Sequence, residues 1–545
     1  MTPEQLSAAI VEVLATLAEE GVLTLPDGVP SAVTIERPRQ REHGDYATNV
    51  ALQLAKKAST NPRALAEQIQ DRLVKVEGVA NVQIAGPGFL NITVEAGAQG
   101  VVAEQIVAAG KQYGRREDAT GGLKVNVEFI SANPTGPIHL GHTRWAVVGD
   151  ALGRVLEAAG AEVTREFYIN DRGRQMDLFG ESLAAAAMGL PVPDDGYHGA
   201  YITELAQLVL ENDPETQGME AFREAGYALQ LKEQQDELAA FNTRFDVWFS
   251  ERGLHQGDVA AQLENLRDLG HLYDADGALW MRTTDFGDDK DRVLIRSNGE
   301  LTYFASDTAY YVNKRSRGFD KCIYLLGADH HGYVGRLKAM AACVGDDPEE
   351  NIEVLIGQLV KIVRGEVEVK LSKRAGDLVT LQELMDEIGV DPLRYSLARY
   401  PQDSPLTLDI EQITRASNDN PVYYVQYVAA RTASILRNAA DLQLAPESHP
   451  ELLTHEKEGD LLRALADLPR VVQGAADLRE PHRVARYLED TAATFHRFYD
   501  ECRVLPRGDE EPTDLHRARL VLVQATRTVF ENGLDLVGVT APERM

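Results

Sequence analysis

Two histidines frame the first group of residues that could do chemistry. His139, Leu140, Gly141 and His142 stand where a β-rich segment gives way to a helical one. A helix N-terminus attracts anions, because its first N–H groups are free and its dipole is positive there. Gly141 allows close backbone approach, and two imidazoles one turn apart can donate hydrogen bonds to phosphate oxygens. The pattern predicts a phosphate-binding turn, although two ordinary histidines at a helix start would look the same.

A second group of chemistry-bearing residues follows about 230 residues later. Lys370, Leu371, Ser372, Lys373 and Arg374 place three cations and a hydroxyl on one short segment. Such a segment suits a clamp on a triphosphate, because it can neutralise charge that develops as pyrophosphate leaves. A basic loop alone is usually just solvated, but the two groups together predict an ATP site. Its predicted residues are His139, Gly141, His142, Lys370, Ser372 and Lys373.

The elements around the first group must position these residues. Residues 124–130 alternate like a strand, 131–137 contain two prolines, 141–159 have helical spacing, and 162–169 read as a strand again. A strand, a tight loop, a helix and a second strand form a βαβ unit. The chain is therefore expected to contain a parallel sheet.

The remaining chain divides into regions of different pattern. Residues 1–115 read as an N-terminal α+β domain that ends at a break rich in glycine and charge. Residues 116–380 are expected to form an α/β core, a Rossmann-type doubly wound parallel sheet with a helical insertion at about 185–290. Residues 381–545 are almost wholly helical in pattern and predict a C-terminal all-α helical bundle.

Composition limits the classes of protein. The net charge of −30 argues against a general nucleic-acid coat protein, although a local basic patch can still bind RNA. No stretch approaches the roughly 18–20 apolar residues of a membrane span, and the acidic N-terminal segment does not look like a secretion signal. Three cysteines without a C-x-x-C pair predict neither a disulfide framework nor structural zinc. A reduced, cytoplasmic setting is expected.

Several separate motifs are similar to those of one protein family. The pair HLGH and KLSKR resembles the HIGH and KMSKS signatures of class I aminoacyl-tRNA synthetases. Four further segments resemble motifs of one group of these enzymes, the arginyl-tRNA synthetases. They are EFISANPTGPIHLGHTR (128–144), DNPVYYVQYVAARTASILR (419–437), HGDYATN (43–49) and GPGFLN (86–91). The resemblance runs over essentially the whole chain. It implies an arginine–tRNA ligase that uses ATP with Mg²⁺, acts on L-arginine and tRNA(Arg), and is a monomer.

The resemblance also implies an arginine pocket. A guanidinium is planar and always charged, and carboxylates recognise it through paired hydrogen bonds. Tyr303 and Asp307 are four residues apart and share a face if their segment is helical. Asp307 is implied as the charge partner, and His330 replaces a glutamine common in the family. The implied contacts are Glu128, Ser131, Asn133, His142, Tyr303, Asp307 and His330. Without the resemblance, Tyr303 would read as a core aromatic and Asp307 as a surface charge. The pair His330 and His331 lacks a third ligand at suitable spacing, so no metal site is predicted.

Other segments are implied to face tRNA. By resemblance, residues 391–395 (DPLRY) join the core to the anticodon-binding helices, and residues 1–115 contact the outer corner of the tRNA. Tyr423, Tyr424 and Tyr427 could stack on unpaired bases, but residues at this spacing cannot all face one way. One stacking tyrosine is expected.

Three other functions remain open at this point. A class I synthetase for another amino acid is disfavoured by the Tyr303 and Asp307 pair. A small-molecule nucleotidyltransferase would not need the long helical C-terminal region. A non-catalytic RNA-binding paralogue would not need both signatures intact.

Overall fold

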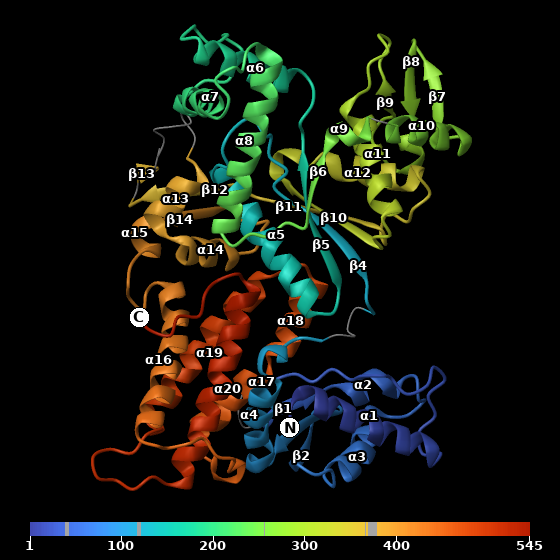
Figure 1. Cartoon of the computed structure of the whole chain (residues 1–545). Coiled ribbons are helices and arrows are strands. Elements are labelled where there is room, and N and C mark those ends of the chain that lie inside the picture. Colours follow the sequence, from blue (N-terminus) through green and yellow to red (C-terminus); the bar gives the residue numbers. More distant parts are fainter. Residues whose placement is uncertain (39–42, 117–120, 256, 366, 369–378) are drawn as a thin grey trace.

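A five-stranded parallel sheet forms the centre of the molecule (Figure 1). The computed structural model describes residues 1–38, 43–116, 121–255, 257–365, 367–368 and 379–545. The strand order is β11-β10-β4-β5-β6, and every neighbouring pair is parallel. The strands are β4 (Lys124–Glu128), β5 (Glu162–Ile169), β6 (Val247–Ser250), β10 (Lys321–Gly327) and β11 (Ile352–Gly357). Helix α5 (Leu140–Ala158) connects β4 to β5, which confirms the predicted βαβ unit.

Both faces of this sheet are covered, as a doubly wound fold requires. Ile323 and Leu325 of β10 belong to the core that contains α5, whereas Cys322 and Tyr324 belong to a second core. That second core includes residues of α11 (Tyr303–Ser316) and α12 (Tyr333–Cys343). The strand order reverses between β4 and β10. Ligands of open α/β sheets bind outside the carboxyl ends of the strands at such a switch point.

The long segment between β5 and β10 is wholly helical in its first part and mixes helices with strands in its second part. Helices α6 (Arg174–Ala187), α7 (Ala200–Asn212) and α8 (Met219–Ala240) share a small core of their own. The chain then returns to the central sheet as β6 and continues through α9 (Glu251–Leu254) and α10 (Asp258–Asp268). An antiparallel sheet follows, with strands β7 (Leu272–Ala275), β8 (Ala278–Met281) and β9 (Arg292–Ile295). The helical insertion expected at about 185–290 therefore contains strands, which are too short to show a period of two.

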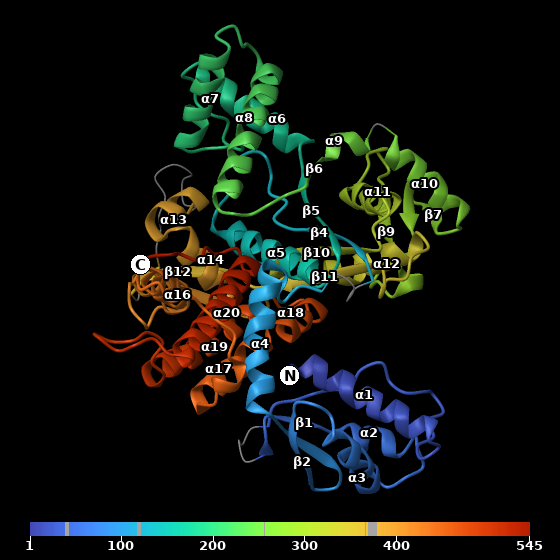
Figure 2. The same ribbon diagram turned by 60° about the horizontal axis from the view of Figure 1, so that its bottom comes forward.

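The N-terminal α+β unit closes earlier than the sequence suggested. Its elements are α1 (Pro3–Glu19), β1 (Tyr46–Thr48), α2 (Val50–Ala55), α3 (Pro62–Leu73), β2 (Val79–Ala85) and β3 (Phe89–Val94). They enclose a separate core that ends at Val94. The next helix, α4 (Ala96–Ala109), places Val102, Ala103 and Ile106 in the large core shared with the C-terminal helices. Figure 2 shows α4 alongside those helices and the N-terminal unit beyond it.

The C-terminal part consists of a small α/β segment and a helical bundle. The segment contains β12 (Val360–Arg364), β13 (Val367–Glu368), α13 (Leu381–Ile388), α14 (Val390–Ala398), β14 (Leu406–Asp409) and α15 (Ile410–Ile413). The bundle contains α16 (Pro421–Asp441), α17 (Glu456–Ala466), α18 (Leu468–Asp477), α19 (His482–Glu501) and α20 (Asp514–Leu536). The expected helical bundle is confirmed, and β14 is the exception because it pairs with β12. Across the described part of the chain, no helix has the length and apolar character needed to cross a membrane.

Candidate functional site

The two predicted histidines face each other at the start of α5. Their ring centroids lie 3.8 Å apart. Each ring accepts a backbone N–H at Nδ1: Gly141 donates to His139 over 3.1 Å, and His139 donates to His142 over 3.5 Å. Burial lowers the pKa of both imidazoles, and burial with the neighbouring His139 lowers that of His142 to about 3. Both rings are therefore neutral near pH 7, with the proton on Nε2, where it can be donated to a ligand oxygen.

The first N–H groups of α5 are already paired, which corrects the sequence-based view of this turn. Leu140 N donates to Val379 O over 2.8 Å, Gly141 N to the His139 ring, and His142 N to His139 O over 2.8 Å. An incoming phosphate would therefore meet the imidazoles and the helix dipole, not free N–H groups. The absence of a side chain at Gly141 leaves room for the His139 ring, because a Cβ at position 141 would lie 3.0 Å from that ring.

A short β-bridge ties this turn to the chain that follows the second signature. His139 pairs with Thr380, and Leu381 N donates to Ile138 O over 2.8 Å. Lys370, Ser372 and Lys373 lie outside the described residues. Val379, the first described residue after that segment, accepts a hydrogen bond from Leu140 N of the histidine turn.

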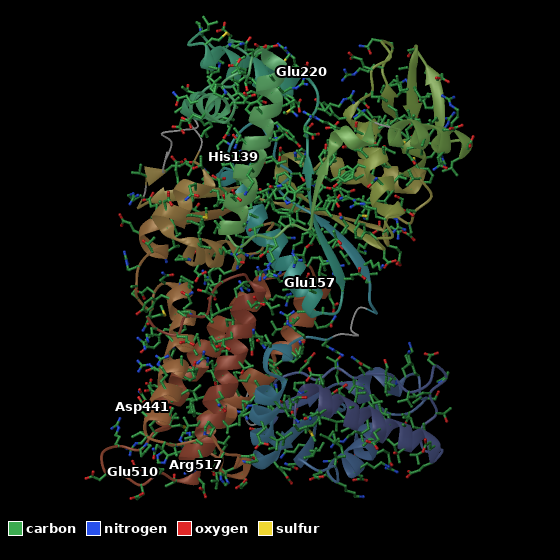
Figure 3. The ribbon with its side chains drawn as sticks, viewed as in Figure 1. His139, Glu157, Glu220, Asp441, Glu510 and Arg517 are labelled. Atoms are coloured by element: carbon green, nitrogen blue, oxygen red, sulfur yellow. The ribbon has the colours of Figure 1, made fainter. Side chains whose placement is uncertain are left out.

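A cavity of about 370 Å³ opens beside the two histidines. Its wall includes exposed Asn133 on one side and Tyr197 and Tyr201 of the insertion on the other. Tyr201 donates its hydroxyl to Thr135 O over 3.0 Å. Buried Gln234 of α8 donates to the carbonyls of Asn133 and Gly136. The insertion therefore holds the loop between β4 and α5 in place. In Figure 3, His139 is labelled near the lower part of α8, at the opposite end of α5 from Glu157.

Glu128, at the end of β4, is already hydrogen-bonded to other side chains of the protein. Its carboxylate accepts from Lys314 Nζ at 2.6 Å and from Ser131 Oγ at 3.1 Å. Lys314 is fully buried and lies over the rings of Tyr310 and Tyr324. Ser131 also accepts from Tyr168 N, so its hydroxyl is engaged within the protein. Ile130 and Ser131 have φ values of 67° and 48°, a left-handed conformation that is costly for such residues and often marks a functional site.

Asp307 sits in a strongly acidic setting on α11. Burial raises the pKa of this carboxyl to about 7, and the neighbouring Glu128 and Glu251 add to the shift, partly offset by Arg336. Glu251 follows β6 directly and is buried. Three carboxylates from β4, from α9 and from α11 therefore converge near the carboxyl edge of the sheet. One more cation at this site would stabilise the ionised form of the three carboxylates.

Tyr168 and Glu251 are the site residues that the sequence analysis missed. The Tyr168 hydroxyl hydrogen-bonds Glu251, and its pKa is raised by burial and by Glu251, Asp307 and Glu128. Both residues stand at or just after carboxyl ends of parallel strands. The signal was available in principle, since ligands bind at those ends. For Glu251 the signal is hidden, because the sequence pattern places β6 in a helical insertion, whereas Tyr168 lies in the predicted strand 162–169.

Two predicted arginine contacts have looser surroundings. Tyr303 and Asp307 are both in α11, so the expected helical face is confirmed, but Tyr303 is 70% exposed. His330 ends the short helix η4 (Ala328–His330), and its contacts are Asp329 at 3.3 Å and the Tyr333 ring. Neither contact belongs to the three converging carboxylates.

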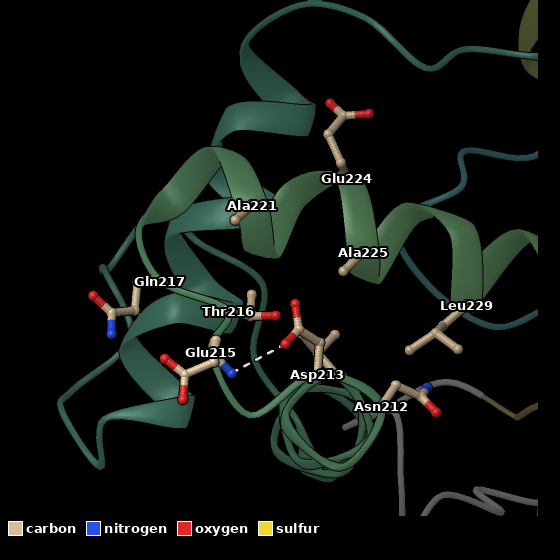
Figure 4. A pocket seen from close by; sticks show the side chains of 10 residues that line it. Asn212, Asp213, Glu215, Thr216, Gln217, Ala221, Glu224, Ala225 and Leu229 are labelled. Carbon is tan, nitrogen blue, oxygen red and sulfur yellow. Dashed lines mark hydrogen bonds between the residues drawn. The ribbon is translucent and has the colours of Figure 1, made fainter.

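Among the residues that the structure describes, no three His, Cys, Asp or Glu side chains are grouped in a way that could hold a metal ion. A larger hollow of about 770 Å³ lies between α7 and α8, and its lining includes Asp213, Glu215 and Glu224 together with apolar residues of α8 (Figure 4). It contains none of the predicted site residues.

An aromatic cluster marks the outer part of the helical bundle. Tyr424 and Tyr427 of α16 lie against the His496 ring of α19, at centroid distances of 4.8 and 5.8 Å. The Arg431 guanidinium lies over the rings of Tyr427 and Tyr499, and Tyr499 is 37% exposed. Partly exposed rings next to a guanidinium are a platform on which unpaired bases can stack.

Family models match the chain in three successive parts. Residues 4–94 match the arginyl tRNA synthetase N terminal domain, and residues 425–545 match the DALR anticodon binding domain. Residues 103–190 and 201–397 match the catalytic domain of class I tRNA synthetases (R). The first boundary agrees with the core that closes at Val94.

Relatives match over the full length. The chain is 56% identical to an arginine–tRNA ligase of Renibacterium salmoninarum and 54% identical to one of Kineococcus radiotolerans, each covering 100% of both chains. The solved arginyl-tRNA synthetase of Thermus thermophilus is 24% identical and superposes over 100% of both chains with a TM-score of 0.77. At that identity the structure supports the fold alone.

Proposed function

The chain belongs to the arginyl-tRNA synthetase family, and on that premise we propose that it ligates L-arginine to the 3′-terminal adenosine of tRNA(Arg) at the expense of ATP. The observation that carries this proposal is the convergence of Glu128, Glu251 and Asp307 near the carboxyl edge of the parallel sheet. A guanidinium placed among them would restore the missing positive charge and allow Asp307 to ionise.

The first step joins arginine to the nucleotide. The arginine carboxylate attacks the α-phosphate of ATP, the bond to the β-phosphate breaks, and pyrophosphate leaves. His139 and His142 donate from Nε2 to phosphate oxygens as charge develops there. We assign Lys370, Ser372 and Lys373 to the same charge stabilisation, from their sequence alone. Magnesium would arrive with ATP and would neutralise part of the charge on its phosphates.

The second step passes the arginyl group to tRNA. The ribose hydroxyl of the terminal adenosine attacks the adenylate carbonyl, AMP leaves with the electron pair of the broken bond, and the proton of the hydroxyl passes to the departing phosphate or to water. No protein nucleophile is needed, so positioning supplies much of the rate. Asn133 is assigned to the α-amino and carboxylate end of arginine, because it lines the cavity that holds both histidines.

Ser131 has a different role in this scheme from the one implied by its position in the motif. Its hydroxyl already bonds Glu128 and Tyr168, so we propose that it orients Glu128. Tyr303, at the exposed start of α11, is proposed to cover the guanidinium. His330 is retained as a polar contact at the edge of the site.

Arginine-dependent exchange of pyrophosphate into ATP tests the proposal, run with and without tRNA of the source organism. Exchange that requires arginine supports it, and a requirement for tRNA as well would match the behaviour implied by the resemblance. Exchange with another amino acid, or none with any, would overturn it. Lys373→Ala should reduce adenylate formation far more than arginine affinity. The enzyme is proposed to act as a cytoplasmic monomer, which sedimentation can check.

A further inference from the structure

Both chain neighbours of Glu251 are bound to one buried carboxylate. Asp171, which follows β5 and is only 1% exposed, accepts from Ser250 Oγ over 2.6 Å and from the backbone N–H of Arg252 over 3.2 Å. The Nε of Arg252 also donates to Asp171 O over 2.8 Å. Asp171 therefore holds the chain on both sides of Glu251, where β6 ends and α9 begins.

The guanidinium of Arg252 extends this contact to helix α8 of the insertion. Its Nη1 and Nη2 donate to the two carboxylate oxygens of Glu224 over 2.7 and 3.2 Å. Tyr227 donates its hydroxyl to Asp171 Oδ2 over 3.0 Å, and its ring centroid lies 5.0 Å from the Arg252 guanidinium carbon. Glu224, labelled on α8 in Figure 4, shares a helix face with Tyr227, because the two are three residues apart. Two side chains of α8 thus fix the chain around Glu251.

The same helix also holds the loop that precedes the histidine turn. Gln234, ten residues after Glu224, donates to Asn133 O and Gly136 O over 3.0 and 2.7 Å. Between Glu224 and Gln234 the helix rises about 15 Å, at ~1.5 Å per residue. One part of α8 is therefore bound to the chain around Glu251 and another part to the loop before the histidines. The helix fixes the distance between these two regions.

We infer that Arg252 is a positioning residue of the arginine site: it ties the Glu251 carboxylate to α8, and through α8 to the histidine turn. The inference rests on the proposed function, in which arginine lies near Glu251 and ATP near the two histidines. The arginine carboxylate must reach the α-phosphate, so the spacing of the two regions affects the first step. Arg252 acts through Glu251, because each of its three guanidinium nitrogens already donates to Asp171 or Glu224.

Calorimetric titration of the full chain with L-arginine at pH 8 tests this inference in Arg252→Gln. Glutamine keeps the backbone N–H that bonds to Asp171, but it removes the paired bonds to Glu224. Arginine binding should weaken about threefold to tenfold, because the Glu251 carboxylate is held less closely in place. In pyrophosphate exchange, the KM for arginine should rise while the KM for ATP stays unchanged. A variant that is only less stable would not separate the two KM values.

Two further measurements separate positioning from a loss of stability. Arg399→Gln is the matched control, because it breaks a paired, partly exposed contact with Glu489 in another part of the fold. Its affinity for arginine should equal that of the unmodified chain. In a chain that already carries Glu251→Gln, Arg252→Gln should cause no further loss of arginine affinity, because both changes act through the same carboxylate.

Unchanged arginine affinity in Arg252→Gln would overturn the inference. So would a full additional loss in the Glu251→Gln chain, because Arg252 would then act elsewhere. Glu224→Gln removes the same paired contact from the other side and should act in the same direction, so it replaces Arg252→Gln if thermal melting shows that variant to be unfolded.

Failure of the proposed function would be recognised separately. If the unmodified chain bound no arginine, with or without tRNA, that function would fall. Amide hydrogen exchange would then decide whether Arg252 holds the start of α9. Arg252→Gln should speed exchange at residues 250–254, and exchange equal to that of the unmodified chain would contradict the inference.

Discussion

Asp307 links arginine binding to protonation. Its pKa of about 7 reflects burial first and then the nearby Glu128 and Glu251. A guanidinium binds the ionised carboxylate, so arginine affinity should rise with pH up to about 7 and level off above it. Below pH 7 the dissociation constant should increase by about tenfold per pH unit. Calorimetric titration of arginine between pH 5.5 and 8.5 measures this. A flat profile for the unmodified chain would contradict it.

Ionisation of the Asp307 carboxyl should lower the free energy of unfolding. Its folded pKa is raised above the usual 3.8, so the folded state binds the proton more tightly than the unfolded state does. Stability from this group is therefore greatest at low pH and declines as pH rises toward 7. Asp307→Asn should raise the free energy of unfolding at pH 8 by about 1–2 kcal/mol and change it little at pH 4, while arginine binding is lost. Denaturant melts at the two pH values compare these effects.

Glu251 is expected to contribute both charge and pKa control. Glu251→Gln keeps the size of the side chain but removes one of the carboxylates that raise the pKa of Asp307. We expect arginine binding to weaken about tenfold at pH 8, with the pH midpoint of binding moved to lower pH. Exposed Glu300→Gln in the same subdomain is the control. An unmoved midpoint would mean that Glu251 does not act on Asp307.

At the scale of elements, the position of α5 decides the position of the histidine turn. The helix comes close to the residue that follows β4 at Gly149, where an added Cβ would lie 2.2 Å from the Phe129 ring. Phe129 has little freedom to retreat, because it stacks on Phe245 at 4.4 Å. A glycine inside a helix is otherwise unfavourable, so close packing explains it here.

Gly149→Ala should therefore push α5 away from the sheet. The expected loss is about 1–3 kcal/mol in the free energy of unfolding, together with a fall in kcat because the imidazoles move with the helix. Gly335→Ala in α12 is the matched control, since its Cβ would meet nothing within 4 Å. Chemical denaturation and pyrophosphate exchange measure the two effects. Equal behaviour of the two variants would show that the contact at Gly149 is not limiting.

At the scale of the whole molecule, one buried carboxylate joins three parts of the chain. Asp150 of α5 lies 2.6 Å from Arg394 of α14 and 2.7 Å from Arg154. Arg394 also donates to Phe241 O, at the end of the insertion, and to Val537 O, after the last helix. Burial alone would raise the pKa of Asp150, but Arg394 and Arg154 outweigh it and lower the pKa. Core, insertion and bundle therefore share one electrostatic contact.

Arg394→Leu should weaken the contact that holds the core, the insertion and the helical bundle together. Removing one partner of a buried pair costs about 3–5 kcal/mol, because the other charge stays buried. We expect the helical bundle to unfold at lower denaturant concentration than the core, giving two transitions in place of one. Arg399→Ala, at the C-terminal cap of α14, breaks a partly exposed pair with Glu489 of α19 and should cost about 1 kcal/mol. A single unshifted transition for Arg394→Leu would contradict the prediction.

The sequence by itself determined the βαβ unit, the histidine turn at its first loop and the helical nature of the C-terminal region. These are local: strand and helix periods, glycine and proline positions, and residues joined by a few peptide bonds. Asp307 could also be placed on a helical face with Tyr303, because four residues span about one turn.

Only the tertiary structure decided which distant residues meet. Glu251 and Tyr168 join Asp307 because β6 and β5 are neighbours in a parallel sheet, and the four residues of β6 give no clear period. The fold also pairs the first N–H groups of α5, which the sequence left available for phosphate; Val379 accepts from Leu140, and His139 accepts from Gly141 and His142. Burial and long-range pairing set the charge of His142 and Asp307, and neither quantity is a property of a residue type or of its neighbours along the chain.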